Sequence, residues 1–245
     1  MDGNFKSYDH LASFGRIDEI LSQSSDFTEA DSLPDRDKLT FTNGFYAYCT
    51  ALFVDIRDSS RLPSHYERPR LARIYRSFIS ETVAILNSDA YVREVNIVGD
   101  CVWAVYNTPR KSDIDDIFSI AAKVNILEDV INHKLKKAGF ETPIYFGIGL
   151  SYGRALMIKA GYKGSTINDV VYMGDVVNQA AHLAARGGKT TGWSRTPRIH
   201  MDGVFQQNLN EDNAGLTQLV ESYPSVYSSN AVNVAMNEWL KAQDA

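Results

Sequence analysis

Three features that define large protein classes are scarce in this sequence: cysteine, long apolar runs and excess positive charge. Only Cys49 and Cys101 occur among 245 residues, so the chain lacks both a disulfide framework and zinc-type spacing. No apolar stretch approaches the roughly 20 residues that span a bilayer, and no signal peptide opens the chain. The formal charge of −5 argues against a general nucleic-acid binder, which is usually basic. We therefore expect a cytoplasmic protein without membrane or nucleic-acid partners.

The composition is that of an ordinary globular protein, with 44% hydrophobic and 22% charged residues. Residues 1–44 have the pattern of an appendage, because helical periodicity over His10–Leu21 leads into a connector rich in Ser and Asp. The pattern weakens again after residue 209. We therefore predict an N-terminal helical appendage (1–44), one large central domain (45–209) and a C-terminal extension (210–245).

Apolar periodicity predicts the fold class. Residues 65–87 and 112–137 repeat apolar side chains at helical intervals, which indicates two amphipathic helices, the second capped by Ser112. Apolar strands are expected at 51–55, 95–105 and 143–150. Shorter strands are expected at 155–160, 170–173 and 198–201, and shorter helices at 175–185 and 202–209. The order of the main elements is that of a ferredoxin-like βαββαβ core, an α+β fold with helices on one face of an antiparallel sheet.

Two aspartates accompany the apolar strands. Asp55 ends the first strand, where a carboxylate can leave the core. Gly99-Asp100 interrupts the second, and because both residue types are depleted in strands, the pair predicts a tight hairpin. The predicted fold places Asp55 beside Asp100, and two close carboxylates repel unless a cation compensates. The pair therefore predicts a site for Mg²⁺ or Mn²⁺; the alternative is that Asp55 caps a turn and Asp100 merely occupies the hairpin.

Two other stretches have the chemistry of phosphate binding. Ser59 and Ser60 lie in a polar turn between a strand and a helix, where backbone N–H groups and a helix N-terminus can cradle a phosphate. Arg154 follows Gly153 beside a buried strand and can hold a phosphate through charge-assisted hydrogen bonds. Turns of this composition are common, and Arg154 can equally be a solvated hairpin arginine.

The helix predicted at 175–185 carries a polar pair. Asn178 and His182 are four residues apart, so they share one helix face, and the alanines between them permit close approach of another surface. This favours a functional helix, although an ordinary helix with a polar stripe has the same pattern.

Together these motifs resemble the catalytic domain of the class III nucleotidyl cyclases, the adenylate and guanylate cyclase family. The stretches that carry the resemblance occur in family order and are Phe53-Val54-Asp55-Ile56, Val98-Gly99-Asp100, Phe146-Gly147-Ile148-Gly149-Leu150 with Gly153-Arg154, and the stretch from Gly174 to Ala181. The resemblance implies that Asp55 and Asp100 bind two divalent ions, assisted by the carbonyl of Ile56. It implies that Arg154 holds the triphosphate and that Asn178 orients the ribose or the transition state. It also implies a homodimer, in which the aspartates of one subunit face Asn178 of the other.

The chain departs from the family at the positions that read a purine base. Asn96 stands where the family has its purine-reading lysine, and Val171 stands at the second base-reading position. A base edge left unpaired in a buried pocket costs about 1–3 kcal/mol, so tight recognition of ATP is disfavoured. The aromatic strand that contains Tyr48 can narrow the pocket for a smaller base. In these respects the chain is similar to the bacterial pyrimidine cyclases of anti-phage (Pycsar) systems, which make cyclic CMP or cyclic UMP to switch on a toxic effector.

A third departure concerns catalysis. His182 stands where the family has its transition-state arginine, and Arg186 or Arg154 are candidate replacements. An asparagine and a histidine at these positions also favour a degenerate domain that binds a nucleotide without turnover.

The resemblance therefore implies a homodimeric cyclase with composite active sites at the subunit interface. Its substrate is a pyrimidine nucleoside triphosphate, UTP favoured over CTP, and its products are the 3′,5′-cyclic monophosphate, as a second messenger in anti-phage defence, and pyrophosphate. The expected site residues are Asn178, Arg154 and His182 for catalysis, Tyr48, Asn96, Val171, Ser59 and Ser60 for the nucleotide, and Asp55, Ile56 and Asp100 for two Mn²⁺ or Mg²⁺ ions. A purine cyclase with unusual base contacts and the degenerate binding domain stay open as alternatives.

Overall fold

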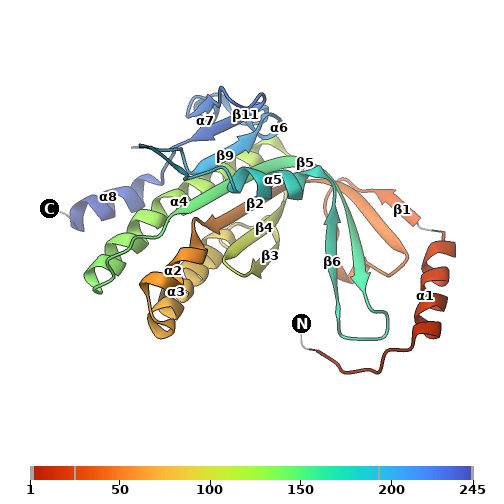
Figure 1. Ribbon diagram of the computed structural model, residues 1–245. Coiled ribbons are helices and arrows are strands. Elements are labelled where there is room, and N and C mark those ends of the chain that lie inside the picture. The colour runs from red at the N-terminus through yellow and green to blue at the C-terminus, as the bar shows by residue number, and fades with distance from the viewer. Residues whose placement is uncertain (1–2, 25, 193, 244–245) are drawn as a thin grey trace.

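The computed structural model describes residues 3–24, 26–192 and 194–243, and a nine-stranded mixed sheet runs through it (Figure 1). The main path of the sheet has the order β10-β11-β9-β5-β2-β4-β3, while β1 pairs with β2 and β6 pairs with β5. The strands of this sheet are β1 (Asp26–Glu29), β2 (Asn43–Ile56), β3 (Val92–Val98), β4 (Cys101–Asn107), β5 (Phe146–Gly161), β6 (Asn168–Met173), β9 (Ile199–Asp202), β10 (Thr217–Leu219) and β11 (Val226–Ser229). A separate two-stranded ribbon joins β7 (Thr190–Thr191) to β8 (Ser194–Arg195).

The chain order β2-α3-β3-β4-α4-β5 confirms the predicted βαββαβ core. The helices are α1 (His10–Ser22), α2 (Leu62–His65), α3 (Arg68–Leu86), α4 (Lys111–Lys137), α5 (Asp175–Ala184), α6 (Gly203–Gln207), α7 (Glu211–Ala214) and α8 (Val234–Gln243), with 3₁₀ turns η1 (Arg36–Lys38) and η2 (Ser59–Arg61). Within the described residues, no helix has both the length and the apolar character that a membrane span requires.

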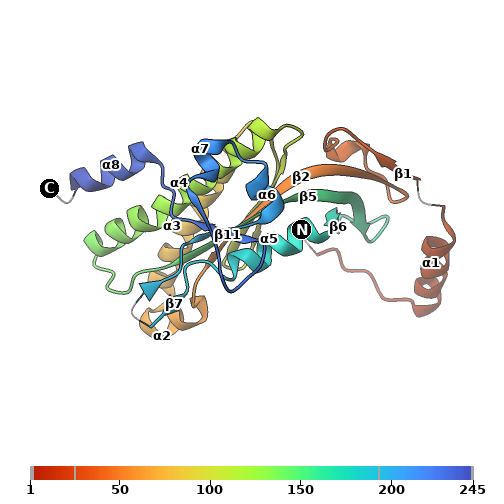
Figure 2. The same cartoon turned by 90° about the horizontal axis from the view of Figure 1, so that it is seen from above.

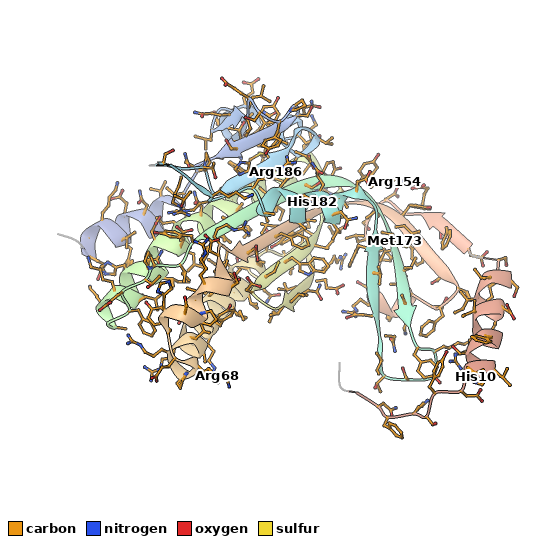
Figure 3. All side chains as sticks on the ribbon, in the orientation of Figure 1. His10, Arg68, Arg154, Met173, His182 and Arg186 are labelled. Atoms are coloured by element: carbon orange, nitrogen blue, oxygen red, sulfur yellow. The ribbon has the colours of Figure 1, made fainter. Side chains whose placement is uncertain are left out.

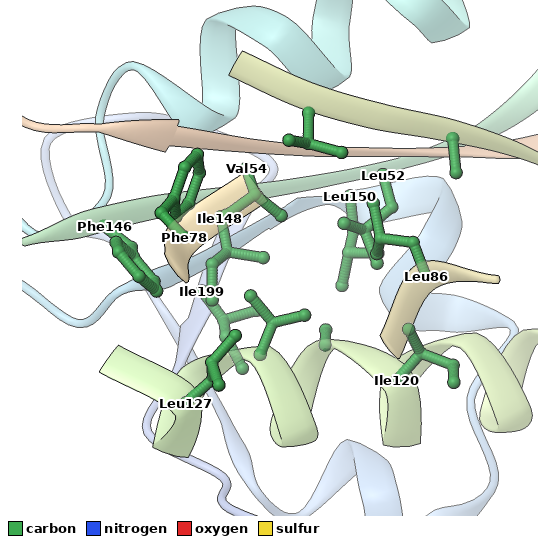
Figure 4. Close-up of a cluster of buried hydrophobic side chains, with 14 of the residues drawn as sticks. Leu52, Val54, Phe78, Leu86, Ile120, Leu127, Phe146, Ile148, Leu150 and Ile199 are labelled. Carbon is green, nitrogen blue, oxygen red and sulfur yellow. The ribbon is translucent and has the colours of Figure 1, made fainter. Parts of the chain in front are cut away.

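The larger core lies between the sheet and helices α3 and α4 (Figure 4). Successive residues of a strand point to opposite faces, so Leu52, Val54 and Ile56 of β2 are buried on this side, where Phe78 of α3 joins the same cluster. Full burial of a side chain of this size is worth roughly 1.5–3 kcal/mol. By the same alternation, Asp55 points to the other face of the sheet.

Helix α5 packs on that other face, where Ala180 and Ala184 join the second buried cluster. The approach is close because β5 carries Gly147 and Gly149 at the contact. A Cβ on Gly149 would lie 2.0 Å from the carbonyl oxygen of Ala180, and one on Gly147 would lie 2.1 Å from that of Ala184. The two helices of the βαββαβ core, α3 and α4, lie on one face as predicted. Helix α5 adds a helix on the other face, and the glycine pair is the physical reason why its backbone can rest on the strand.

Strands β2 and β5 are long, and together they extend beyond the body of the molecule (Figures 1 and 2). They pair without interruption from Gly44, opposite Ile158, to Ile56, opposite Phe146. The two strands predicted at 143–150 and 155–160 are thus one strand, because this continuous pairing with β2 carries β5 through the Gly153-Arg154 pair. Arg154 lies inside this strand and not in a hairpin.

The flanking segments are more structured than expected. The predicted connector contains β1, which pairs in parallel with the start of β2. Helix α1 forms as predicted, but its apolar side chains are exposed. Helix α4 begins after Arg110, whose backbone N–H donates to the Asp113 carboxylate at 2.9 Å, and Ser112 is not its N-cap. Beyond residue 209, β10 and β11 extend the sheet past β9, and α8 lies along α4 with Lys134 over the ring of Trp239.

Candidate active site

Asp55 and Asp100 lie side by side at one end of the β2–β4 ladder. Asp55 pairs with Cys101, the residue after Asp100, and the amide of Ile56 donates to the Asp100 carbonyl oxygen at 3.4 Å. The hairpin predicted between β3 and β4 is present, and its Gly99 has φ +62°, a conformation that glycine adopts without strain. Strand register therefore brings the two carboxylates together.

Burial, one neighbouring carboxylate and one neighbouring guanidinium set the electrostatics around Asp55. Burial raises the pKa of the Asp55 carboxyl, Arg57 opposes the rise, and Asp100 adds to it. Burial, with contributions from both aspartates, also raises the pKa of the Cys101 thiol to about 12. In the part of the chain that the structure describes, no third His, Cys, Asp or Glu completes a cluster of three. Mg²⁺ is usually held by one or two carboxylates together with substrate phosphates and water, so this pair fits an ion of that class.

Arg57 joins the aspartate pair to helix α5. Its guanidinium forms an ion pair with the Asp55 carboxylate and donates to the carbonyl oxygen of Ala185 at 3.0 Å, just past the end of α5. The arginine side chain is only 12% exposed, and a cation suits the negative end of a helix. Sequence reasoning missed Arg57, although residues two apart in extended chain share a face and signal such a contact.

The turn after β2 lies beside the aspartates. Ser59 lies beside the hydroxyl of Tyr75 on α3, and burial followed by the nearby Asp100 raises the pKa of that hydroxyl. Ser60 is exposed. The turn leads into η2 and the four-residue helix α2, so the expected long helix N-terminus does not begin here. Sequence reasoning assigned Tyr75 to the apolar stripe of its helix, and nothing in the local pattern separates it from its core neighbours.

Arg154, Asn178 and His182 line a second site, a groove of about 620 Å³ between β5 and α5. Figure 3 shows Arg154 and His182 where this strand and helix meet. Asn178 and His182 are exposed on the side of α5 that faces away from the sheet. Gly174, with φ +141°, begins the helix close to β5, since a Cβ there would lie 3.0 Å from the carbonyl oxygen of Arg154.

The two arginines proposed as catalytic replacements have different surroundings. Arg154 is exposed, forms an ion pair with Glu29 of β1 and lies 3.8 Å from the ring centre of Tyr46. Arg186 lies 4.1 Å from the ring centre of Tyr223 and is not among the described residues that line the groove. Arg154 is thus the arginine that lines the same groove as Asn178.

The three predicted base-contacting residues lie on three strands. Asn96 of β3 donates to the Glu94 carboxylate at 3.2 Å, and the cross-strand neighbour of Asn96 is Trp103. Val171 of β6 is 41% exposed. Tyr48 of β2 is also exposed and lies against another tyrosine of β5, with ring centres 5.7 Å apart. The buried Glu94 was not expected from the sequence.

Comparison with known proteins identifies the family. The family model described as the adenylate and guanylate cyclase catalytic domain matches residues 43–215. The chain belongs to this family. A uridylate cyclase of Gulbenkiania mobilis is 44% identical to this cyclase-family chain, over 98% of each. A uridylate cyclase of Treponema porcinum is 35% identical, over 95% of this chain and 81% of that protein. The predicted resemblance is therefore confirmed.

Solved structures confirm the cyclase fold. The adenylyl cyclase CyaB of P. aeruginosa superposes with a TM-score of 0.61 at 18% identity, covering 76% of this chain and 95% of that one. A class III adenylyl cyclase-like ATP-binding protein from Pseudomonas aeruginosa reaches a TM-score of 0.68 at 18% identity, covering 92% of this chain and 48% of that one. At this level of identity the likeness concerns the fold alone.

Proposed function

We propose that this protein is a divalent-metal-dependent pyrimidine nucleotidyl cyclase, which converts UTP, or less readily CTP, into the 3′,5′-cyclic monophosphate and pyrophosphate. The observation that carries the proposal is the meeting of Asp55 and Asp100 at one end of the β2–β4 ladder in a chain of the cyclase family. The near-full-length likeness to uridylate cyclases supports a pyrimidine substrate.

The aspartate pair is suited to Mg²⁺ or Mn²⁺. The two carboxylates and the carbonyl of Ile56 would hold the ions, and phosphate oxygens of the nucleotide would complete the coordination. Such ions, when bound, make the ribose 3′-hydroxyl more acidic and neutralise charge on the leaving pyrophosphate. Ser59 and Tyr75, which lie beside the carboxylates, can donate hydrogen bonds to the phosphates from the same side.

The groove residues supply positioning and charge. Arg154 can donate parallel hydrogen bonds to the triphosphate, and the Asn178 amide can orient the ribose so that its 3′-oxygen attacks the α-phosphorus in line. The bond to the pyrophosphate then breaks. Holding the reacting atoms in this geometry and compensating the developing charge account for most of the rate in such phosphoryl transfers. His182, one turn after Asn178, can donate to the same phosphates.

The proposed site is shared between two copies of the chain. In support, Asp55 points from the α5 face of the sheet, whereas Asn178 and His182 are exposed on the far side of α5. A homodimer with twofold symmetry would provide two equivalent composite sites. Exposed apolar side chains near both halves favour coverage by protein: Val98 is 64% exposed and Met173 is 50% exposed.

Substrate choice follows from the base-contacting residues. Val171 offers no hydrogen bond to a base edge, and the Asn96 amide, which has one donating and one accepting end, can pair with either pyrimidine. The Tyr48 side chain adds an aromatic surface near Arg154, the residue that pairs with Tyr48 across the β2–β5 ladder.

Turnover of the four nucleoside triphosphates tests the proposal. Purified protein with Mn²⁺ is incubated separately with UTP, CTP, ATP and GTP, and cyclic nucleotide and pyrophosphate are measured. We expect product from UTP above all. Product from a purine alone would support the purine cyclase, and binding of a nucleotide without any product would support the degenerate domain.

A biological role follows from the resemblance to pyrimidine cyclases of anti-phage systems. We propose that the cyclic nucleotide is a second messenger that activates a toxic effector during infection. Bacteria that express the protein together with a toxic effector that responds to the cyclic nucleotide should survive phage challenge, and an Asp55→Asn variant should not protect them. Equal survival with both versions would contradict this role.

A further inference from the structure

Glu94 is a buried acid beside the proposed base site, and three side chains contact its carboxylate. It is 8% exposed. The Asn96 amide nitrogen donates to its Oε1 at 3.2 Å and the hydroxyl of Tyr172 donates to its Oε2 at 3.2 Å. Arg36 lies 3.6 Å from the same Oε1. All three contacts come from donors, so the carboxylate acts as an acceptor on both oxygens.

This arrangement fixes the direction of the Asn96 amide. An amide has a donating NH₂ end and an accepting oxygen end, and a carboxylate can only accept. Reversing the amide would place its oxygen against the Glu94 carboxylate and leave two acceptors facing each other, which is unfavourable. The amide therefore keeps its oxygen and its second N–H directed away from Glu94. The neighbouring ring of Trp103 stacks on Phe53 at 5.1 Å, which provides a flat aromatic surface next to the amide.

The fixed direction matters because the two pyrimidines are opposites at this edge. Uracil presents a donor at N3 and an acceptor at O4, whereas cytosine presents an acceptor at N3 and a donor at N4. An amide that can rotate pairs with either base, and one that cannot rotate pairs with one base only. We propose that Glu94 locks the Asn96 amide in one orientation and thereby makes the enzyme select uracil over cytosine. This inference rests on the proposed function, in which Asn96 lies beside the base, and it makes Glu94 a positioning residue.

The substitution Glu94→Gln tests the lock. Glutamine has the same shape, but its amide can donate or accept, so Asn96 is free to rotate. The measurement is kcat/KM for UTP and for CTP. We expect the UTP-to-CTP ratio to fall roughly tenfold, mainly because CTP becomes a better substrate. A purely structural role would lower both values together and leave the ratio unchanged, and that result would overturn the proposal. Glu81→Gln, an exposed glutamate of α3, is the matched control.

A double-mutant cycle separates the lock from other effects. Asn96→Ser removes the amide and should abolish the preference, and Glu94→Gln should then change the ratio no further. A preference that survives Asn96→Ser would overturn the lock even if Glu94→Gln fails to fold. Tyr172→Phe removes another partner of Glu94 and should keep the ratio; a loss equal to that of Glu94→Gln would also overturn the lock.

Failure of the proposed function gives a different result. If the wild-type protein cyclises neither pyrimidine nucleotide, the cyclase proposal fails. The lock is then tested by measuring the affinities for UTP and CTP by calorimetry. Glu94→Gln must then narrow the difference in affinity, and an unchanged difference overturns the lock.

Discussion

The two halves of the candidate site are built in different ways. The aspartate pair is set by backbone: the register of β2 with β4 and the turn at Gly99 fix where both carboxylates lie. The groove half is set by exposed side chains on α5 and β5, and its arginine is engaged by Glu29 from a flanking strand. The first half is complete within one chain, whereas the second faces outward.

The difference shows how the fold divides its tasks. A rigid ladder suits a cation site, since coordination tolerates little error in ligand position. An outward-facing helix suits a contact with another subunit, because its side chains can enclose a substrate only when a second protein surface covers them. Arg57 links the two halves within one chain through its ion pair with Asp55 and its hydrogen bond to the carbonyl oxygen just past the end of α5.

The largest effect is expected from Asp55→Asn. The change keeps the shape of the side chain but removes the charge on which cation binding depends, so turnover of UTP should fall roughly 10³-fold or more. Pyrophosphate release measures the loss. Chelation of metal with EDTA should match it in the wild-type protein, and excess Mn²⁺ should reverse only the chelation. Activity retained by the variant would show that the aspartate carboxylates are not part of the active site.

Asn178→Ala tests the other half. We expect a loss of roughly 10²-fold in kcat, comparable to removing one transition-state hydrogen-bond donor, with Mn²⁺ binding unchanged. Mixing Asp55→Asn subunits with Asn178→Ala subunits then sharpens the comparison. In a mixed dimer one composite site carries both changes and the other carries neither, so roughly a quarter of the wild-type activity should return. If the mixture stays as inactive as its components, the two halves do not meet across a dimer.

Arg57→Met examines the link between the halves. It leaves the buried end of the Asp55 carboxylate and the Ala185 carbonyl without their donor, so the free energy of unfolding should fall by about 1–3 kcal/mol. Urea denaturation measures this. Arg68→Met removes an exposed arginine of α3 (Figure 3) and should change stability by less than about 0.5 kcal/mol. Equal stability of both variants would mean that the Arg57 contacts contribute nothing.

The sequence predicts the aspartate half of the site, which the backbone positions, better than the groove half. Periodicity locates α3 and α4, and the Gly99-Asp100 pair locates the hairpin, because local propensities dictate both. It does not reveal that β5 runs unbroken through Gly153, since only the pairing with β2 maintains that strand. The sequence does not predict Tyr75 and Glu94 as site residues, for a related reason. Each has the pattern of an ordinary helix or strand position, and only packing places it beside a site residue.

The smallest effect is expected from Glu29→Ala, which frees Arg154 from its ion pair. Both side chains are largely exposed, 43% for Arg154 and 68% for Glu29, and ion pairs between exposed side chains contribute little. A triphosphate must exchange with Glu29 to reach the arginine, so the KM for UTP should fall by roughly one and a half to fivefold, with kcat unchanged. The same effect should shrink at high salt, because salt screens exposed charges. A raised KM would instead show that Glu29 holds Arg154 in the geometry that binds substrate, and the groove half would then be as preorganised as the aspartate pair.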